Sequence, residues 1–356
     1  MTFRRYNLIL ASILVPVVLM LVATSFFLQP YDGGLTRLGG YPEKLYGWTV
    51  PQQRFPKPLY RQFKTREAEY REPADVILVG DSFTFLDQVS WPNFFARQTG
   101  LRVQSFRLDK TPVSKLIDSE TWRQHPPKIF IYESVERILA ARLNQKLTEC
   151  QLKPAPMLLP LGIRPLMVEG QAYNRDTRTT ALDFSMSIDF LTKTIPREYF
   201  GRDRTKVARV PLGVEAPFSN VERRQLLVYK DDLKKRGWSD SDWETIRCNF
   251  IAMQNRVQAN GKTFFVAMVA PDKLTAYSEL LADRSLAGLS RIDRLAVDSK
   301  LHLPRFDRRL QQAVREGVVD VYLNNDTHWG SVGSEMVARD LVAYLRQAGV
   351  LVQAGQ

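Results

Sequence analysis

The sequence predicts an α/β fold, with a doubly wound parallel sheet of about five strands that follows an N-terminal transmembrane helix. Short, continuous apolar runs predict buried parallel strands, because helices cover both faces of such strands. Amphipathic segments of helical period lie between and after these runs, and this alternation is typical of a doubly wound sheet. The predicted strands are residues 76–79, 103–106, 129–132, 263–269 and 318–323, and the predicted helices are residues 91–98, 112–124, 242–258, 306–314 and 331–348.

The N-terminus predicts a membrane anchor. Arg4 and Arg5 precede an uncharged run over residues 6–31, and a helix over residues 8–28 would span a hydrocarbon core of about 30 Å. A cleaved signal peptide usually has a shorter apolar region followed by a small-x-small cleavage site, so we favour an uncleaved signal anchor. The short basic tail predicts a single-pass protein of the inner membrane, with the tail in the cytoplasm and the folded domain in the periplasm.

The composition divides the chain into segments. Residues 32–73 are rich in Pro, Gly, Tyr and charge, and predict a stalk and lead-in after the anchor at residues 1–31. Residues 74–350 contain the predicted strands and helices of the sheet domain. Within them, residues 143–240 are Pro- and Arg-rich with weak periodicity, which predicts an insertion or cap on the sheet domain.

The charge of the chain is strongly positive, with 50 basic residues against 38 acidic ones and a formal net charge of +12. This balance favours anionic partners such as lipid headgroups or an acidic polysaccharide. No zinc-finger or RNA-binding signature accompanies the basic residues, so we do not expect a nucleic-acid partner. The histidines are scattered at positions 125, 302 and 328, and the sequence predicts neither a metal nor a cofactor.

Cys150 and Cys248 are the cysteines of the chain. In an oxidising periplasm they could form a disulfide that closes a long loop. They could equally be two unrelated buried thiols, and the sequence leaves both alternatives open.

Gly80-Asp81-Ser82 directly follows the first predicted strand, at the position where parallel sheets place their ligands. The glycine lets the backbone turn tightly, and a helix starting near Ser82 would offer free N–H groups that stabilise an oxyanion. This pattern predicts that Ser82 is a nucleophile. The alternative is that Asp81 and Ser82 only cap a helix.

Asp326-Thr327-His328 follows the last predicted strand and precedes the final predicted helix. A serine nucleophile needs a base that takes its proton, and an imidazole needs a carboxylate that fixes its tautomer and orientation. Because both loops follow strand ends, they can open onto one face of the sheet. We therefore predict a triad of Ser82, His328 and Asp326, although Asp326 could instead hold a structural loop histidine.

These motifs resemble those of a known family. Gly80-Asp81-Ser82-Phe83 is similar to the first block of SGNH (GDSL-type) hydrolases, and Asp326-Thr327-His328-Trp329 is similar to their last block. The resemblance implies an SGNH/flavodoxin-like three-layer sandwich, and it implies that residues 74–350, apart from most of the insertion, form an SGNH-like catalytic domain.

More narrowly, the chain resembles the alginate O-acetyltransferase branch of this family. The GDSF and DTHW tetrapeptides carry this resemblance together with residues 270–273 (APDK), Tyr277, and residues 132–137 (YESVER) at a strand end. In that branch the DTHW block precedes the GDSF block, whereas here GDSF comes first, as in ordinary SGNH hydrolases. A triad tolerates such a permutation because its geometry defines it, and not its sequence order.

The middle blocks of SGNH hydrolases supply a Gly and an Asn to the oxyanion hole. Here residues 107–112 contain no glycine, and Glu133 stands at a strand end. We therefore expect the backbone N–H of Ser82 as one oxyanion donor. Asp81, Glu133 and Arg137 are candidates for oxyanion or substrate binding. Arg137 could bind an acyl donor or a sugar, or it could form a structural ion pair.

The triad predicts two-step acyl transfer through a Ser82 acyl-enzyme. The anchor and the resemblance imply an extracytoplasmic O-acetyltransferase that acts on hydroxyls of an exported polysaccharide, with a membrane-bound O-acyltransferase as the supplier of acetyl groups. A membrane-anchored esterase or deacetylase would use the same triad with water as the acceptor. A non-catalytic scaffold of a polysaccharide secretion complex and a teichoic-acid D-alanylation type of SGNH protein are further alternatives.

Overall fold

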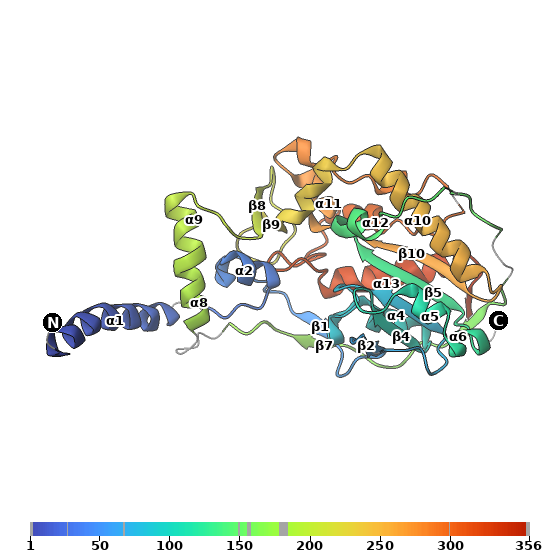
Figure 1. The fold of residues 1–356 in the computed structure, drawn as a ribbon, viewed down its shortest axis with the longest axis horizontal. Helices are drawn as coiled ribbons and strands as arrows, with labels where there is room; N and C mark the ends of the chain where they lie inside the picture. Colours follow the sequence, from blue (N-terminus) through green and yellow to red (C-terminus); the bar gives the residue numbers. More distant parts are fainter. Residues whose placement is uncertain are drawn as a thin grey trace.

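The centre of the molecule is a five-stranded sheet with helices on both faces (Figure 1). The structure, a computed structural model, describes residues 3–26, 28–66, 68–148, 150–154, 158–177, 184–298 and 300–353. Neighbouring strands of this sheet are parallel throughout, in the order β10-β5-β3-β4-β2. They are β2 Arg61–Phe63, β3 Val76–Gly80, β4 Val103–Arg107, β5 Ile129–Val135 and β10 Phe264–Ala270. The predicted α/β fold is confirmed.

Both faces of the sheet are buried, as its continuous apolar strands require. Along β3, Val76 and Leu78 belong to one hydrophobic core, and Ile77 and Val79 belong to the other. Burying one such side chain contributes about 1.5–3 kcal/mol, so the two cores together stabilise a three-layer sandwich. The first core includes α4 Trp91–Thr99, α12 Phe306–Arg315 and α13 Ser331–Gln347, and the second includes α5 Val113–Ile117, α6 Glu120–Gln124 and α10 Asp240–Gln258.

The helices α4, α10, α12 and α13 begin and end within two residues of their predicted positions. α10 begins earlier than predicted because Ser239 and Asp242 form a capping box. The single helix predicted over residues 112–124 is wrong. It is divided into α5 and α6, because the Ser119 hydroxyl accepts the N–H of Trp122 at 3.2 Å and starts a new helix.

The strand predicted over residues 318–323 is also wrong. An isolated bridge between Tyr322 and Trp329 forms there instead. The backbone turns at Gly317 (φ 80°) and at Asp320 (φ 56°), and an extended strand contains neither conformation. The carboxylate of Asp320 accepts the N–H of Ser219 at 2.9 Å, which holds the turn. The fifth strand of the sheet is β2, which comes from the predicted lead-in.

The helix predicted to start near Ser82 is wrong as well. Residues 82–84 form a turn, in which the N–H of Thr84 donates to the carbonyl of Asp81 and the N–H of Phe85 donates to the carbonyl of Ser82, both at 3.2 Å. The short 3₁₀ helix η1 Asp87–Val89 follows this turn.

The predicted stalk, residues 32–73, packs on the domain. Its side chains Leu35, Tyr46, Phe55 and Tyr60 are buried, because removing such large apolar groups from water favours packing over an extended stalk. The packed α/β domain therefore includes residues before the predicted boundary at residue 74. The elements of this segment are α2 Gly34–Gly39, α3 Glu43–Tyr46, β1 Gln52–Arg54 and β2.

Residues 143–240, predicted as an insertion or cap, contribute strands outside the central sheet. β7 Gln171–Tyr173 pairs antiparallel with β1, and β6 Leu161–Ile163 pairs in parallel with β11 Leu351–Gln353. That this segment is an insertion stays a prediction, and its residues 149, 155–157 and 178–183 lie outside the described residues. Its other elements are α8 Phe184–Asp189, η3 Phe190–Thr194, α9 Ile195–Phe200, the antiparallel pair β8 Val207–Pro211 and β9 Gln225–Tyr229, and η4 Lys230–Gly237.

Short helical turns complete the described part of the chain. They are η2 Glu136–Ile138, α7 Leu139–Arg142, α11 Lys273–Ala276, η5 Ser278–Leu280, η6 Arg284–Leu286 and η7 Ile292–Arg294.

α1 Phe3–Ser25 is the one helix of the described residues that is long and apolar enough to cross a membrane. It projects from the body of the molecule (Figure 1). Its apolar side chains are largely exposed. The predicted span over residues 8–28 overlaps α1, while its residue 27 lies outside the described residues. The length and composition of α1 fit a membrane span.

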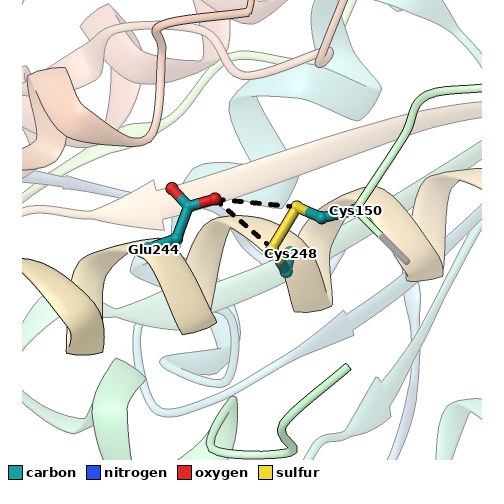
Figure 2. A group of neighbouring side chains, drawn as sticks. All are labelled: Cys150, Glu244 and Cys248. Carbon is teal, nitrogen blue, oxygen red and sulfur yellow. Dashed lines mark hydrogen bonds between the residues drawn. A yellow bond between two sulfur atoms is a disulfide. The ribbon is translucent and has the colours of Figure 1, made fainter. Parts of the chain in front are cut away.

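A disulfide joins Cys150 and Cys248, whose Cα atoms lie 5.0 Å apart (Figure 2). It connects the segment after α7 to the middle of α10, across a sequence separation of 98 residues. Glu244 lies one helical turn before Cys248, with Oε1 3.6 Å from the Cys248 sulfur and 3.9 Å from the Cys150 sulfur. Because sulfurs bonded to each other are not thiolates, these three residues do not form a metal site while the disulfide is intact.

Removing this disulfide is expected to destabilise the protein. A covalent bond between distant segments reduces the entropy of the unfolded chain, and such bonds typically contribute about 2–4 kcal/mol. We expect Cys248→Ser to lower the free energy of unfolding by about that amount in urea titrations of the full chain in detergent. Reductant should lower the stability of the parent protein and leave that of Cys248→Ser unchanged. Equal stability of the two proteins without reductant would contradict this expectation.

Candidate active site

The structure brings the residues of the predicted triad together. His328 Nε2 lies 2.9 Å from Ser82 Oγ, and His328 Nδ1 lies 2.6 Å from Asp326 Oδ1. Ser82 and His328 are 246 positions apart in the sequence. The serine follows the carboxyl end of β3, and the histidine lies just before α13. The three side chains thus have the connectivity of a serine–histidine–carboxylate triad.

A glycine is required where β3 ends and the serine turn begins. A Cβ atom on Gly80 would lie 2.3 Å from Thr84 Oγ1 and 2.8 Å from Glu133 Oε2, which is closer than such atoms approach. The absence of a side chain lets the turn close over the end of β5, where Glu133 is buried.

Glu133, in β5, supports the serine turn through hydrogen bonds. Its Oε2 accepts the N–H of Asp81 at 2.9 Å and the hydroxyl of Thr84 at 3.0 Å. Complete burial, together with the nearby Asp81 carboxylate, raises the pKa of Glu133 well above its usual range and favours its neutral form. Glu133 is thus buried next to the serine turn, where it holds the backbone of that turn.

Asp81 is also part of the framework of the turn. Its Oδ1 accepts the N–H of Phe83 at 3.2 Å. Its Oδ2 accepts the N–H of Val135 at 2.8 Å and a guanidinium N–H of Arg142 at 2.7 Å. These bonds connect the serine turn to the end of β5 and to α7. Both carboxylate oxygens of Asp81 therefore accept hydrogen bonds from other groups of the protein.

Aromatic packing fixes the serine turn against the histidine loop. The ring of Phe83 lies edge-to-face with the His328 imidazole, 4.8 Å between centroids, and with the Trp329 ring, 4.7 Å between centroids. Phe83 and Trp329 are both buried. The last residue of each tetrapeptide thus aligns the two motifs with each other.

Asp326 is held on both of its carboxylate oxygens. Oδ1 accepts the backbone N–H of His328 at 3.0 Å as well as the imidazole, and Oδ2 accepts the N–H of Gly34 at 2.7 Å. Burial raises the pKa of Asp326, but His328 and these hydrogen bonds outweigh burial and hold that pKa below its usual range. The carboxylate is therefore ionised wherever the protein is folded near neutral pH.

The N-terminus of α2 packs directly on the loop that contains Asp326. The carbonyl of Asn325 accepts the N–H of Leu35 at 2.9 Å, and the Asn325 amide donates to Glu43 at 2.6 Å. A Cβ atom on Gly33 would lie 2.1 Å from that same carbonyl oxygen, so the close approach requires glycine. The sequence analysis missed this contribution, because the only local signal is the pair Gly33-Gly34 before an apolar residue.

Lys273, from the APDK motif, also positions the loop that contains Asp326. Its Nζ donates to the carbonyls of Leu323 at 3.0 Å, Asn324 at 2.9 Å and Asp326 at 2.7 Å. The side chain is fully buried, and burial lowers the pKa of Lys273 to about 7. The Lys273 amino group thus satisfies three carbonyls of one short loop.

Arg137 lies in buried ion pairs. Its guanidinium is 2.8 Å from Asp272 and 3.4 Å from Asp232, and it lies over the ring of Tyr229. Burial opposes its charge, but these carboxylates raise the pKa of Arg137 further. Lys235 pairs with the same Asp272 at 2.6 Å. The positive charge of Arg137 thus compensates the buried carboxylates of Asp232 and Asp272.

A pocket with a volume of about 210 Å³ opens beside the imidazole. Its lining includes His328 and Asp326 from the triad, and Asp32, Trp48 and Tyr173 from segments that the sequence analysis did not assign to the site. The rings of Trp48 and Tyr173 lie 5.8 Å apart. Partial burial and the nearby Asp326 raise the pKa of Asp32. The pocket combines two aromatic rings with acidic groups next to the triad.

Part of the chain is similar to a known family of proteins. Residues 226–356 match the family model of the SGNH hydrolase-like domain of acetyltransferase AlgX. The resemblance to the alginate O-acetyltransferase-like branch of SGNH hydrolases is confirmed. The matched residues include Asp326 and His328, whereas Ser82 precedes them.

A curated relative supports the same branch. The probable alginate O-acetylase AlgJ of Azotobacter vinelandii is 29% identical over 102 residues, which cover 27% of this chain and 26% of that protein. The match thus spans about a quarter of the relative's length. No solved structure matches the chain significantly.

The raised pKa of Glu133 predicts a pH-dependent gain of stability in Glu133→Gln. The parent must keep a proton on Glu133 in the folded state, whereas the unfolded chain releases it above a pKa of about 4.3. The parent therefore loses stability as the pH rises through this range, and the amide does not. We expect the free energy of unfolding of Glu133→Gln, relative to the parent, to increase from about pH 4 to about pH 7 in urea titrations.

Glu133→Ala is the matched control for this experiment. It removes the acceptor of the Asp81 N–H and the Thr84 hydroxyl, so it should be less stable than Glu133→Gln at every pH. A difference between parent and Glu133→Gln that does not change with pH would contradict the neutral, buried role of this residue.

Proposed function

We propose that this protein is a membrane-anchored, extracytoplasmic O-acetyltransferase that moves acetyl groups through a Ser82 acyl-enzyme onto hydroxyls of an exported polysaccharide. The observation that carries the proposal is the hydrogen-bonded chain from Ser82 through His328 to Asp326, beside a pocket with two aromatic rings. The similarity to acetyltransferase AlgX and to the alginate O-acetylase AlgJ supports this reaction class.

In the first half-reaction, His328 Nε2 accepts the hydroxyl proton of Ser82 while Oγ attacks the carbonyl carbon of an acetyl donor. Within the described part of the chain, the backbone N–H of Ser82 has no hydrogen-bond acceptor, so it is free to donate to the oxyanion. When the tetrahedral intermediate collapses, His328 returns the proton to the leaving group. The acetyl group remains on Ser82 as an ester.

In the second half-reaction, His328 removes the proton of an acceptor hydroxyl, whose oxygen attacks the acetyl-serine carbonyl. Collapse of this second intermediate returns the proton to Ser82 Oγ and releases the O-acetylated acceptor. Asp326 stabilises the imidazolium in both halves, because its lowered pKa keeps it ionised while His328 carries the proton.

The pocket beside His328 is the proposed acceptor site. The ring of Tyr173 offers an apolar face on which a sugar can stack, and the buried ring of Trp48 packs against Tyr173 and supports it. The carboxylate of Asp32 can accept hydrogen bonds from sugar hydroxyls. A hydroxyl bound here lies next to His328, which is the base that the second half-reaction requires.

The proposed location is the periplasmic face of the inner membrane, with α1 as an uncleaved signal anchor. The apolar length of α1 supports the anchor, and the disulfide between Cys150 and Cys248 supports an oxidising compartment. An enzyme on that side needs a supplier of acetyl groups, and we propose a membrane-bound O-acyltransferase in that role.

The acyl-enzyme is directly testable by mass spectrometry. The full chain in detergent, incubated with an activated acetyl ester, is expected to gain one acetyl group that maps to Ser82. Ser82→Ala and His328→Ala should abolish the adduct, because they remove the nucleophile and the base. Asp326→Asn should slow acylation by a factor of about 10⁴, because it leaves the imidazole in the wrong tautomer.

The same assay separates the rival functions. Circular dichroism establishes that each variant is folded. A folded parent protein with neither adduct nor turnover would favour the non-catalytic scaffold. Rapid release of acetate to water, with no transfer to any glycan offered, would favour the esterase or deacetylase.

Tyr173→Ala tests the acceptor pocket. Loss of the ring should reduce acetyl transfer to a glycan acceptor several-fold, up to about tenfold, because an aromatic contact contributes about 0.5–1.5 kcal/mol. Acylation of Ser82 by an activated ester should be unchanged, since the ring is needed only for the acceptor. Tyr173→Phe keeps the ring and should transfer normally. An equal fall in acylation and in transfer would argue against an acceptor site at Tyr173.

A further inference from the structure

A helix runs across the end of α1 where the chain enters the folded domain (Figure 1). It consists of α8, the π-helical segment η3 and α9, which follow each other without a break from Phe184 to Phe200. The hydroxyl of Ser187 in α8 donates to the carbonyl of Leu21 in α1 at 3.2 Å. The helix is therefore attached to the anchor itself.

The point of contact sets the depth of this helix relative to a membrane. Leu21 lies one turn before the end of α1 at Ser25, which corresponds to about 6 Å along the helix axis. A hydrocarbon core of about 30 Å that begins after Arg5 ends within about 10 Å of Leu21, so this contact lies near the outer boundary of the core. The helix from α8 to α9 then lies at the surface of the bilayer.

One side of this helix faces the body of the protein. Lys193 donates to the carbonyl of Arg37 at 3.0 Å, and Arg197 donates to the carbonyl of Gly40 at 3.2 Å. Thr194 is buried on the same side and also donates to Gly40. These bonds hold the C-terminal end of α2.

Large apolar side chains of the helix are left without protein contacts to bury them. Ile188, Tyr199 and Phe200 are 48%, 77% and 67% exposed. Ile188 lies in α8, and Tyr199 and Phe200 are the last two residues of α9, so exposed apolar groups occur at both ends of the helix. Apolar and aromatic groups at this depth match the interfacial region of a bilayer, where amphipathic helices bury one face.

The loop that directly follows Phe200 adds positive charge at the C-terminal end of the helix. The side chains of Arg202, Arg204 and Lys206 form no ion pair within the described residues, and they line a pocket of about 470 Å³ next to Pro196 of α9. Asp203 lies among them but is paired with Lys230 at 3.3 Å. The loop therefore presents net positive charge to any anionic surface that the helix touches.

We propose that this helix and loop form a membrane seat, defined as Ile188, Tyr199, Phe200, Arg202, Arg204 and Lys206. The apolar members lie among the lipid headgroups and upper acyl chains of the membrane that α1 spans, and the basic members bind anionic headgroups. The inference rests on the anchoring part of the proposed function and is independent of the acyl chemistry. It adds a second contact to the single helix, which fixes the orientation of the domain on the bilayer.

The test uses the full chain with Phe200→Cys, labelled with an environment-sensitive bimane dye. The native cysteines are in the disulfide, so the dye reacts with the new thiol. The protein is reconstituted into phosphatidylcholine vesicles with and without phosphatidylglycerol, each containing a lipid with a shallow doxyl quencher. We expect a blue-shifted emission and quenching about twofold or more above that of a water-exposed site, increasing with phosphatidylglycerol.

Val297→Cys is the matched control, because Val297 is 74% exposed and follows η7, which packs against α10 on the sheet domain. Its dye should remain unquenched in every vesicle. Replacing Arg202, Arg204 and Lys206 by Glu should remove the increase that phosphatidylglycerol causes at position 200. Equal quenching at positions 200 and 297 would overturn the seat, and an increase that survives charge reversal would overturn its basic part.

Flotation of the same vesicles in alkaline carbonate reports separately on α1. A chain that fails to float would overturn the anchor and the seat together. A chain that floats with an unquenched dye at position 200 would overturn the seat alone. The Ser82 acylation assay does not depend on either result, so a failure of the seat and a failure of the proposed enzyme are distinguishable.

Discussion

His328 lies between two loops from distant parts of the chain, and its imidazole bonds to both at once. Ser82 is 2.9 Å from one ring nitrogen and Asp326 is 2.6 Å from the other. A series of hydrogen-bonded side chains in a partly buried site is stable only when each side chain keeps its hydrogen-bond partner. The serine turn after β3 and the loop before α13 must therefore stay in register, and packing of Phe83 against His328 and Trp329 provides that register. Much of the surrounding structure serves to hold these loops.

The two loops are supported in opposite ways. The serine turn is held by a neutral carboxylic acid. The side chain of Glu133 is buried next to the turn with a raised pKa, and it accepts two hydrogen bonds from it. The histidine loop is held by an amino group, since Nζ of Lys273 donates to three of its carbonyls. Each support matches the groups that the loop exposes: the turn offers donors, and the loop offers acceptors. The site is thus placed by buried polar residues, and the triad itself supplies only the chemistry.

Sequence patterns predicted the parts of the structure whose cause is local. The strands β3, β4, β5 and β10 are continuous apolar runs, and Ser82 follows the end of β3 by two residues. β2 was missed because a three-residue, partly exposed edge strand has no such run. Residues 318–323 were predicted wrongly because their apolar pattern resembles a strand, whereas the bond from Ser219 to Asp320 turns the chain. The bond from Gly34 to Asp326 joins residues 292 positions apart, and no local pattern encodes it.

That last bond forms only because the segment after α1 packs on the domain. An extended linker would leave Oδ2 of Asp326 without the Gly34 N–H and open to water. α2 supplies this donor at its N-terminus, and its C-terminal end is held by Lys193 and Arg197 of the helix that crosses α1. A continuous set of contacts therefore runs from the anchor through α9 and α2 to the triad carboxylate. In the proposed enzyme, this arrangement keeps the triad at a fixed position relative to the membrane, which the acyl-enzyme requires if its acetyl groups come from a membrane-bound donor.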